Sequence, residues 1–307
     1  MPPPLLLHFD QRPSALVYMA RACLPSPGFE PSVGVPAIQA RWINASVSPQ
    51  ALYDFSHLTQ LAPDGTLPVL FPQTWAFRVQ MAVLTHRAFP FPLWRALQIR
   101  NSLVQHRPVA PGSPLQIETR VAGQRLLDKG TEVDLTTTMR AGEELLWEGS
   151  TTFYYRRPLG NDQPSPSARA PETAGETVAR WRSDSGAGYR FGRLTGDYNG
   201  VHLNDGYARL LGFRRAFHHP HRIVGQCLAQ LTASGLPSAA EHSATQRLDL
   251  WLKGPVYYEA DLTLRAFARD DGCRFFLFLA GDERPAIVGC WRAADEPPPS
   301  GFVVPHA

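Results

Sequence analysis

The hydrophobic pattern in the first half of the chain predicts one buried helix followed by four strands. Residues 73–85 are mostly apolar, contain no glycine or proline, and are long enough for a buried helix. Four runs of mostly alternating apolar and polar residues follow, near LQIRNSLVQHR, LQIETRVAGQR, KGTEVDLTTTMR and LLWEGSTTFYYR. They predict a four-stranded antiparallel meander. Upstream, Ser48 and Pro49 suit the cap and the first residue of another helix.

The second half repeats this order. A helix-like run, HRIVGQCLAQLTA, begins at His221 and precedes strand-like runs at TQRLDLWLKG, ADLTLRAFAR, CRFFLFLAG and PAIVGCWRA. In both halves a Pro-Val pair stands seven residues before the leucine that opens a strand, at Leu115 and Leu262. A duplicated helix-plus-sheet unit explains the repeat, and a chance match of two loose patterns is the alternative. Each curled sheet can cover its apolar face with one helix, and two such sheets can pair edge to edge.

The composition divides the chain into two domains. Residues 161–177 are rich in Pro, Ser, Ala and Gly, which cannot build a core, so this segment is predicted to be a linker. The predicted domains are therefore residues 1–160 and 178–307.

Charge and cysteine content narrow the class of protein. The 30 basic and 27 acidic residues give a net charge of +3 and form no run of Lys or Arg, so nucleic acid is not an expected partner. The four cysteines are far apart in apolar contexts, which predicts buried, reduced thiols and a cytoplasmic location. The N-terminus lacks the positive region of a signal peptide, and no apolar run reaches the roughly 20 residues of a membrane span.

One segment, RLTGDYNGVHLNDGYARLLGFRRAFHHPHRIVG at 193–225, carries candidate chemistry. Asp197 and His202 stand five positions apart at the two ends of a predicted tight loop, where they can act as an acid/base pair. Asn199 between them can hold the loop through side-chain to backbone hydrogen bonds. The alternative is a turn with a surface histidine.

The three histidines that follow, His218, His219 and His221, do not predict a metal site. No carboxylate or cysteine follows them at ligand spacing, and zinc usually draws three or four well-placed ligands. His219 is expected to line the mouth of a pocket or to pack at the start of the helix.

The segment resembles the motif of the MaoC-like, (R)-specific enoyl-CoA hydratases and acyl dehydratases. That motif is an aromatic residue, then Gly-Asp-x-Asn-Pro-aliphatic-His, an alanine six residues later, a Gly-Phe and a His-Gly. Two positions depart from it, because Gly200 replaces the usual proline and Pro220 replaces the usual glycine. The register is otherwise ungapped from Gly196 to Gly225, and the matching residues are Phe191, Leu194, Gly196, Asp197, Asn199, Val201, His202, Ala208, Gly212, Phe213 and His219.

The resemblance implies an α+β double hot-dog fold, in which two antiparallel curled sheets each wrap a central helix. It also implies reversible hydration of a trans-2-enoyl thioester to the (R)-3-hydroxyacyl thioester in fatty acid metabolism, with Asp197 and His202 as catalytic residues and no cofactor. The first half matches only as a hot dog without the motif. The expected partner is an acyl-CoA or an acyl carrier protein thioester, and the chain is expected to be a monomeric pseudo-dimer or a homodimer.

The departure at Pro220 affects the expected chemistry. In the family, a backbone N–H at this position stabilises the charge that develops on the thioester oxygen, and proline has no N–H. His221 and Gly196 are therefore the candidates for polarising the thioester. Two alternatives stay open: an impaired acyl-thioester binding protein and a hot-dog thioesterase. Substrate binding or loop support is assigned to Asn199, His219, Phe213 and Arg222.

Overall fold

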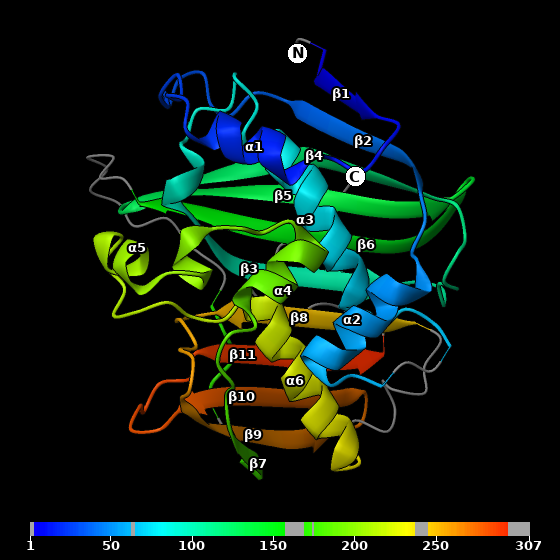
Figure 1. Cartoon of the computed structure of the whole chain (residues 1–307), viewed down its shortest axis with the longest axis vertical. Helices are drawn as coiled ribbons and strands as arrows, with labels where there is room; N and C mark the ends of the chain where they lie inside the picture. The colour runs from blue at the N-terminus through cyan, green and yellow to red at the C-terminus, as the bar shows by residue number, and fades with distance from the viewer. Residues whose placement is uncertain (1–2, 63–64, 157–168, 174, 237–244, 294–307) are drawn as a thin grey trace.

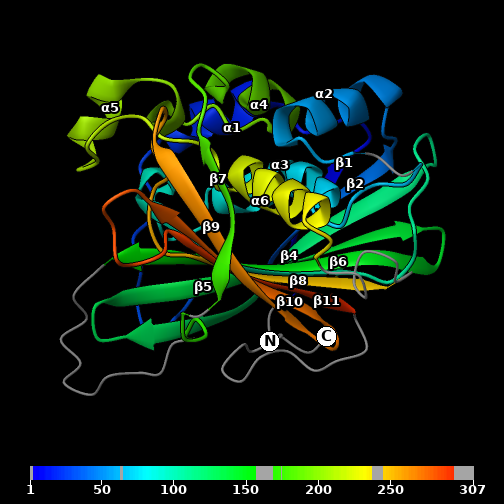
Figure 2. The same cartoon turned by 90° about the horizontal axis from the view of Figure 1, so that it is seen from below.

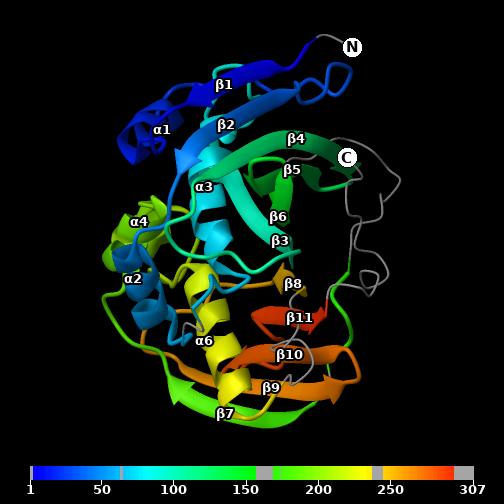
Figure 3. The same cartoon turned by 90° about the vertical axis from the view of Figure 1, so that its right-hand side faces the viewer.

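The strands of both halves form one mixed sheet, with every helix of the described chain on the same face of it (Figures 1 and 2). The computed structural model describes residues 3–62, 65–156, 169–173, 175–236 and 245–293. The sheet has eleven strands in the order β1-β2-β4-β5-β6-β3-β8-β11-β10-β9-β7. It curls toward the helices at both ends, which confirms the α+β class (Figure 3).

The four strands predicted in the first half are all present, with two unpredicted strands outside them. Their spatial order differs from that of the predicted meander, because β3 lies beside β6 and not beside β4. That placement leaves β3 at the inner edge, where it pairs with the second half. The strands, in spatial order, are β1 (Leu5–Phe9), β2 (Ile38–Ala45), β4 (Leu115–Leu127), β5 (Gly130–Ala141), β6 (Glu144–Arg156) and β3 (Ala96–Gln105).

The second half repeats this topology in reverse spatial order. The two halves meet where β3 pairs antiparallel with β8, from Arg100 opposite Trp251 to Gln105 opposite Gln246. This pairing removes an exposed strand edge from each half, as the sequence predicts. From the centre outward the strands are β8 (Gln246–Leu252), β11 (Ile287–Ala293), β10 (Gly272–Leu279), β9 (Asp261–Arg269) and β7 (Glu176–Arg182).

Each half has one central helix under the curl of the sheet, α3 (Phe71–Leu84) or α6 (Pro220–Ala233), and both are predicted from the sequence. Every α3 residue except Phe77 is buried, as expected of a helix without a continuous polar face. Polar residues occur in both helices even so, and Gln73, Arg78 and Gln80 are buried in α3.

Shorter helices cover the two central ones. At the start of α2, the Ser48 side chain accepts a hydrogen bond from the Ala51 N–H at 3.2 Å, which confirms the predicted cap. The pattern missed α4 and α5 because they are only one or two turns long. The elements are α1 (Ala15–Ala22), α2 (Pro49–Thr59), η1 (Leu93–Arg95), α4 (Gly188–Thr195), η2 (Gly200–His202) and α5 (Asp205–Leu210).

The structure bears on two further predictions, the linker and the buried cysteines. Most of the predicted linker lies outside the described residues, and its last two residues already belong to β7. All four cysteines are free, but Cys23 at the end of α1 is exposed, so burial is wrong for that thiol. Among the described residues, none of the helices has the length and apolarity that crossing a membrane requires.

Candidate active site

The loop that carries Asp197 begins where α4 ends. Gly196 has a φ of +87°, a left-handed conformation that suits glycine, and its N–H donates to the Gly192 carbonyl at 2.6 Å. The Gly196 carbonyl accepts a hydrogen bond of 2.5 Å from the Tyr18 hydroxyl. Both polar groups of Gly196 are therefore occupied within the protein. In this structure Gly196 forms the turn that ends α4, and its role in polarising a thioester stays a prediction.

Asn199 holds the loop by the side-chain to backbone bonds that its position predicts. Its N–H donates to Asp197 Oδ1 at 3.1 Å, and its own Oδ1 accepts from the Val201 N–H at 3.3 Å. The single turn η2 then returns the chain, so that His202 faces Asp197. Gly200, which replaces the usual proline, is the first residue of that turn.

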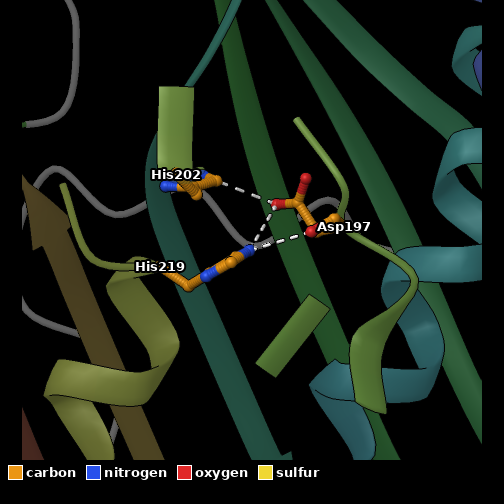
Figure 4. Close-up of side chains that lie close together, drawn as sticks. All are labelled: Asp197, His202 and His219. Atoms are coloured by element: carbon orange, nitrogen blue, oxygen red, sulfur yellow. Dashed lines mark hydrogen bonds and ion pairs between the residues drawn. The ribbon is translucent and has the colours of Figure 1, made fainter. Parts of the chain in front are cut away.

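Asp197 and His202 face each other across a short gap (Figure 4). His202 Nε2 lies 3.7 Å from Asp197 Oδ2, which is longer than a direct hydrogen bond. His202 Nδ1 lies 3.0 Å from the Phe217 carbonyl, so the neutral ring carries its proton on Nδ1. The lone pair of Nε2 is thereby directed at the gap, where it can accept a proton.

His219 is the third side chain at this site. Its Nε2 donates to the Asp197 carbonyl at 3.0 Å, and its ring stacks on that of His202 with 4.0 Å between centroids. Burial holds the pKa of His219 well below its usual value, and the neighbouring His202 lowers the pKa further. The uncharged ring of His219 thus lines the site, in keeping with the supporting role predicted for it.

Asp197, His202 and His219 also form a cluster whose potential metal ligand atoms lie within 4.8 Å of one another. The sequence indicates no such cluster, because it forms only when the loop and the start of α6 meet. His219 Nε2 carries a proton in this arrangement, since its partner is a carbonyl oxygen, and therefore offers no lone pair to a metal. The arrangement therefore fits an acid/base pair better than a metal site.

The surroundings of Asp197 make its carboxylate more basic. Burial raises the pKa of Asp197 above its ordinary value, while His202 and the Asn199 N–H oppose that shift. A raised pKa makes the ionised carboxylate a stronger base than an exposed aspartate. Asp197 still keeps 18% of its side chain exposed, against 7% for His202, so the carboxylate is the more accessible partner.

Arg222 is held in place by neighbouring side chains of the second half. Its guanidinium makes two hydrogen bonds to the Asp184 carboxylate, at 2.8 and 2.6 Å, and a third contact to His218 Nδ1 at 3.0 Å. These partners suit the loop-support alternative of the prediction for Arg222, and substrate binding by this residue stays a prediction. Phe213 packs on Phe217, whose carbonyl orients His202, and thus supports the site from behind.

The first half contributes two residues that the sequence does not indicate. Tyr18 on α1 and Arg78 on α3 both pack against Gly196, and Arg78 also donates to the Arg193 carbonyl at 3.3 Å. Both side chains are buried. Because they lie more than a hundred residues from the motif, no spacing rule links them to it.

The start of α6 lies beside the acid/base pair. Pro220 is the first residue of α6 and has no N–H. The N–H groups of a first helical turn have no intrahelical partner, so the His221 N–H is the first donor available there. The His221 side chain extends into the first half, where its Nε2 lies 3.2 Å from Asn101 Oδ1.

The fold is that of a double hot dog, and its second half places an acid and a histidine face to face. No family model matches the chain. A curated relative, 3-hydroxyacyl-thioester dehydratase X of Mycobacterium tuberculosis, is 26% identical over 231 residues, which cover 73% of this chain and 82% of the relative.

Solved structures show the same fold. The crystal structure of HtdX of Mycobacterium tuberculosis has a TM-score of 0.70 at 22% identity and covers 83% of this chain and 99% of its own. A MaoC-like dehydratase from Phytophthora capsici has a TM-score of 0.68 at 15% identity and covers 85% and 95%. A Mycobacterium tuberculosis protein described as a double hotdog has a TM-score of 0.53 at 16% identity and covers 89% and 97%. These likenesses confirm the predicted fold and the resemblance to MaoC-like dehydratases.

Proposed function

We propose that this protein catalyses the reversible hydration of a trans-2-enoyl thioester to the (R)-3-hydroxyacyl thioester. One observation carries the proposal: the unprotonated Nε2 of His202 and Oδ2 of Asp197 face each other at 3.7 Å. Two such acceptors can hold one water molecule between them. The similarity to a protein named 3-hydroxyacyl-thioester dehydratase X supports the same chemistry.

The mechanism follows from this pair. His202 Nε2 takes a proton from the water, and the hydroxide oxygen forms the bond to the β-carbon. The electrons of the double bond move toward the thioester oxygen. The imidazolium, stabilised by the Asp197 carboxylate, then returns its proton to the α-carbon, so the atoms of one water are added in total. Dehydration is the same sequence in reverse, and no step needs a redox cofactor.

The developing charge on the thioester oxygen needs a donor. The His221 N–H stands at the N-terminal end of α6, where the helix dipole adds positive potential. We assign it the role that the family gives to the N–H at the preceding position, here removed by Pro220. Loss of one such donor costs about a hundred- to a thousand-fold in rate, so the substitution by proline must be compensated for rapid turnover.

We propose that the carrier of the acyl group is negatively charged. A surface hollow of about 520 Å³ lies beside the segment that leads into α6, and it brings Arg214, Lys253 and Arg284 together with two acidic residues. Phosphate groups of coenzyme A or of an acyl carrier protein suit such cations. Participation in fatty acid metabolism, a cytoplasmic location and assembly as a monomer or homodimer stay predictions.

The first test follows the loss of enoyl-thioester absorbance with crotonyl-CoA and with longer trans-2-enoyl-CoAs. We expect Asp197→Asn and His202→Ala each to lower kcat by about 10²- to 10⁴-fold. Asp54→Asn is the matched control, because this carboxylate lies on α2 and faces Arg193 at 3.8 Å, outside the pair. Turnover that survives both active-site substitutions would refute the assigned roles.

The same samples separate the alternatives. An impaired binding protein would bind acyl-CoA without turnover, and Pro220→Gly would then raise the rate by restoring an N–H at the start of α6. A thioesterase would release free coenzyme A thiol in place of the hydrated product. Release of that thiol at the rate of enoyl loss would contradict the hydratase.

A further inference from the structure

The His221 side chain is anchored by the first half of the chain. Asn101 lies on β3 opposite Leu250 of β8, at the line where the two halves pair. Its Oδ1 is 3.2 Å from His221 Nε2 and also accepts a hydrogen bond of 2.6 Å from the Gln98 side chain. Asn101 is fully buried and His221 is 8% exposed, so water does not compete freely for this contact.

The orientation of the Asn101 amide is itself determined by its neighbours. Its Nδ2 donates to Thr151 Oγ1 at 2.9 Å, which directs Oδ1 toward His221. Thr151 Oγ1 also accepts from Gln80 Nε2 at 3.0 Å. A continuous hydrogen-bonded path thus runs from Gln80 on α3, through β6 and β3, to the second residue of α6. This path gives the buried Gln80 side chain of α3 a hydrogen-bonding partner.

The path also determines the protonation of His221. His221 Nε2 lies 3.2 Å from the acceptor Asn101 Oδ1 and 3.3 Å from the donor Gln98 Nε2, which already donates to Asn101 Oδ1 at 2.6 Å. We therefore place a proton on His221 Nε2, directed at Asn101 Oδ1. Burial lowers the pKa of His221 to about 4, so the ring stays neutral at physiological pH. A neutral, buried and hydrogen-bonded ring is a rigid anchor for the backbone to which it is attached.

We propose that Asn101 of the first half is a positioning residue for the His221 N–H, the donor that polarises the thioester carbonyl. The inference rests on the proposed function, since it names the support of that same site. A helix that starts with proline offers its first N–H one residue later than usual. The anchor on β3 holds His221 where this later N–H meets the thioester oxygen, so the half without the acid/histidine motif completes the site.

Asn101→Leu tests the proposal, because leucine has a similar volume and no hydrogen-bonding group. We expect kcat to fall about ten- to a hundred-fold with little change in KM, since a polarising donor acts on the transition state more than on binding. His221→Leu should have the same effect, and the double variant should lose no more than either single one. Thr152→Val is the matched control, because it removes a buried hydrogen bond to Asp134 in the same half, outside the path.

A second measurement does not depend on turnover. Butyryl-CoA labelled with ¹³C at the thioester carbonyl has no double bond to hydrate, and the infrared stretch of its carbonyl reports polarisation when it is bound. We expect a lowered frequency in the wild type, a return toward the solution value in Asn101→Leu and His221→Leu, and no change from wild type in Thr152→Val. Thermal unfolding of each variant identifies any that fails to fold, and His221→Leu then replaces Asn101→Leu.

The outcomes distinguish the two proposals. A lowered carbonyl frequency that depends on Asn101, without hydration of crotonyl-CoA, would support the positioning role and refute the hydratase. Hydration with a carbonyl frequency unaffected by Asn101→Leu would overturn the positioning role alone. Equal losses in Asn101→Leu and Thr152→Val, or additive losses in the double variant, would also overturn it, because they indicate general destabilisation.

Discussion

The two central helices share a length and a type of start but differ in what stands before them. Each has 14 residues and a proline in its first turn. The segment before α6 supplies His219 and lies against Asp197 and His202, whereas the segment before α3 is apolar and ends at Leu70. The same helix start therefore occurs twice in the fold. The segment before each helix determines which start lies beside the acid and the histidine.

The first half has a different role in the same site. Tyr18 bonds to the turn ahead of Asp197, and Asn101 bonds to the side chain of His221. Both contacts cross from one half to the other. The half without the acid/histidine motif thus supports the site in the other half.

The contact between the halves at Gly196 provides the largest predicted effect among the supporting residues. Gly196→Ala places a methyl group against the Tyr18 hydroxyl and the Arg78 guanidinium, in addition to straining a left-handed residue. Gly212 has nearly the same φ, +88°, with no atom within 4 Å of an added methyl, so Gly212→Ala isolates the backbone strain. We expect Gly212→Ala to cost about 1–2 kcal/mol and Gly196→Ala about 1–3 kcal/mol more.

Chemical denaturation measures these stabilities, and the hydration assay should show a loss of kcat for Gly196→Ala alone. Equal effects of the two glycine substitutions would show that the first half does not support the loop.

The Tyr18 hydroxyl provides a smaller effect. Tyr18→Phe leaves the buried Gly196 carbonyl without this partner, which costs about 1–3 kcal/mol, and the looser turn should lower kcat while KM changes little. Tyr154→Phe is the control, because its hydroxyl bonds to a carbonyl in an exposed setting and its loss should cost less than about 0.5 kcal/mol. Unchanged stability and kcat in Tyr18→Phe would contradict the supporting role of α1.

The smallest predicted effect is on the pH dependence of stability. It concerns Asp197 in the loop and none of the residues that support the loop. Because folding raises the pKa of Asp197, ionisation of this carboxyl costs stability as pH rises above the value of an unfolded aspartate, near 4. Asp197→Asn removes that cost, so the variant should be more stable than wild type at neutral pH and equally stable at pH 3. Denaturant unfolding at both values checks this, and a variant that is less stable at neutral pH would refute the assignment.

The sequence predicts the loop of Asp197 and His202 well and the contacts that support it poorly, for a physical reason. Asp197 and His202 are five residues apart, and the turn between them is built by Asn199 within the same loop. Local hydrogen bonds of this kind follow from the order of residues. By contrast, the partners of Gly196 and Arg222, Tyr18 and Asp184, are revealed only when distant segments pack.

The sequence by itself determined the elements and the reacting pair: two buried helices, their strands, and a loop that joins an acid to a histidine. Periodicity and turn chemistry act over a few residues, so they are visible without a fold. Only the tertiary structure decided which strand lies at the centre of the sheet and that His221 is anchored on Asn101. Those features depend on contacts between the halves, and contacts between segments that are far apart in sequence leave no regular spacing in the chain.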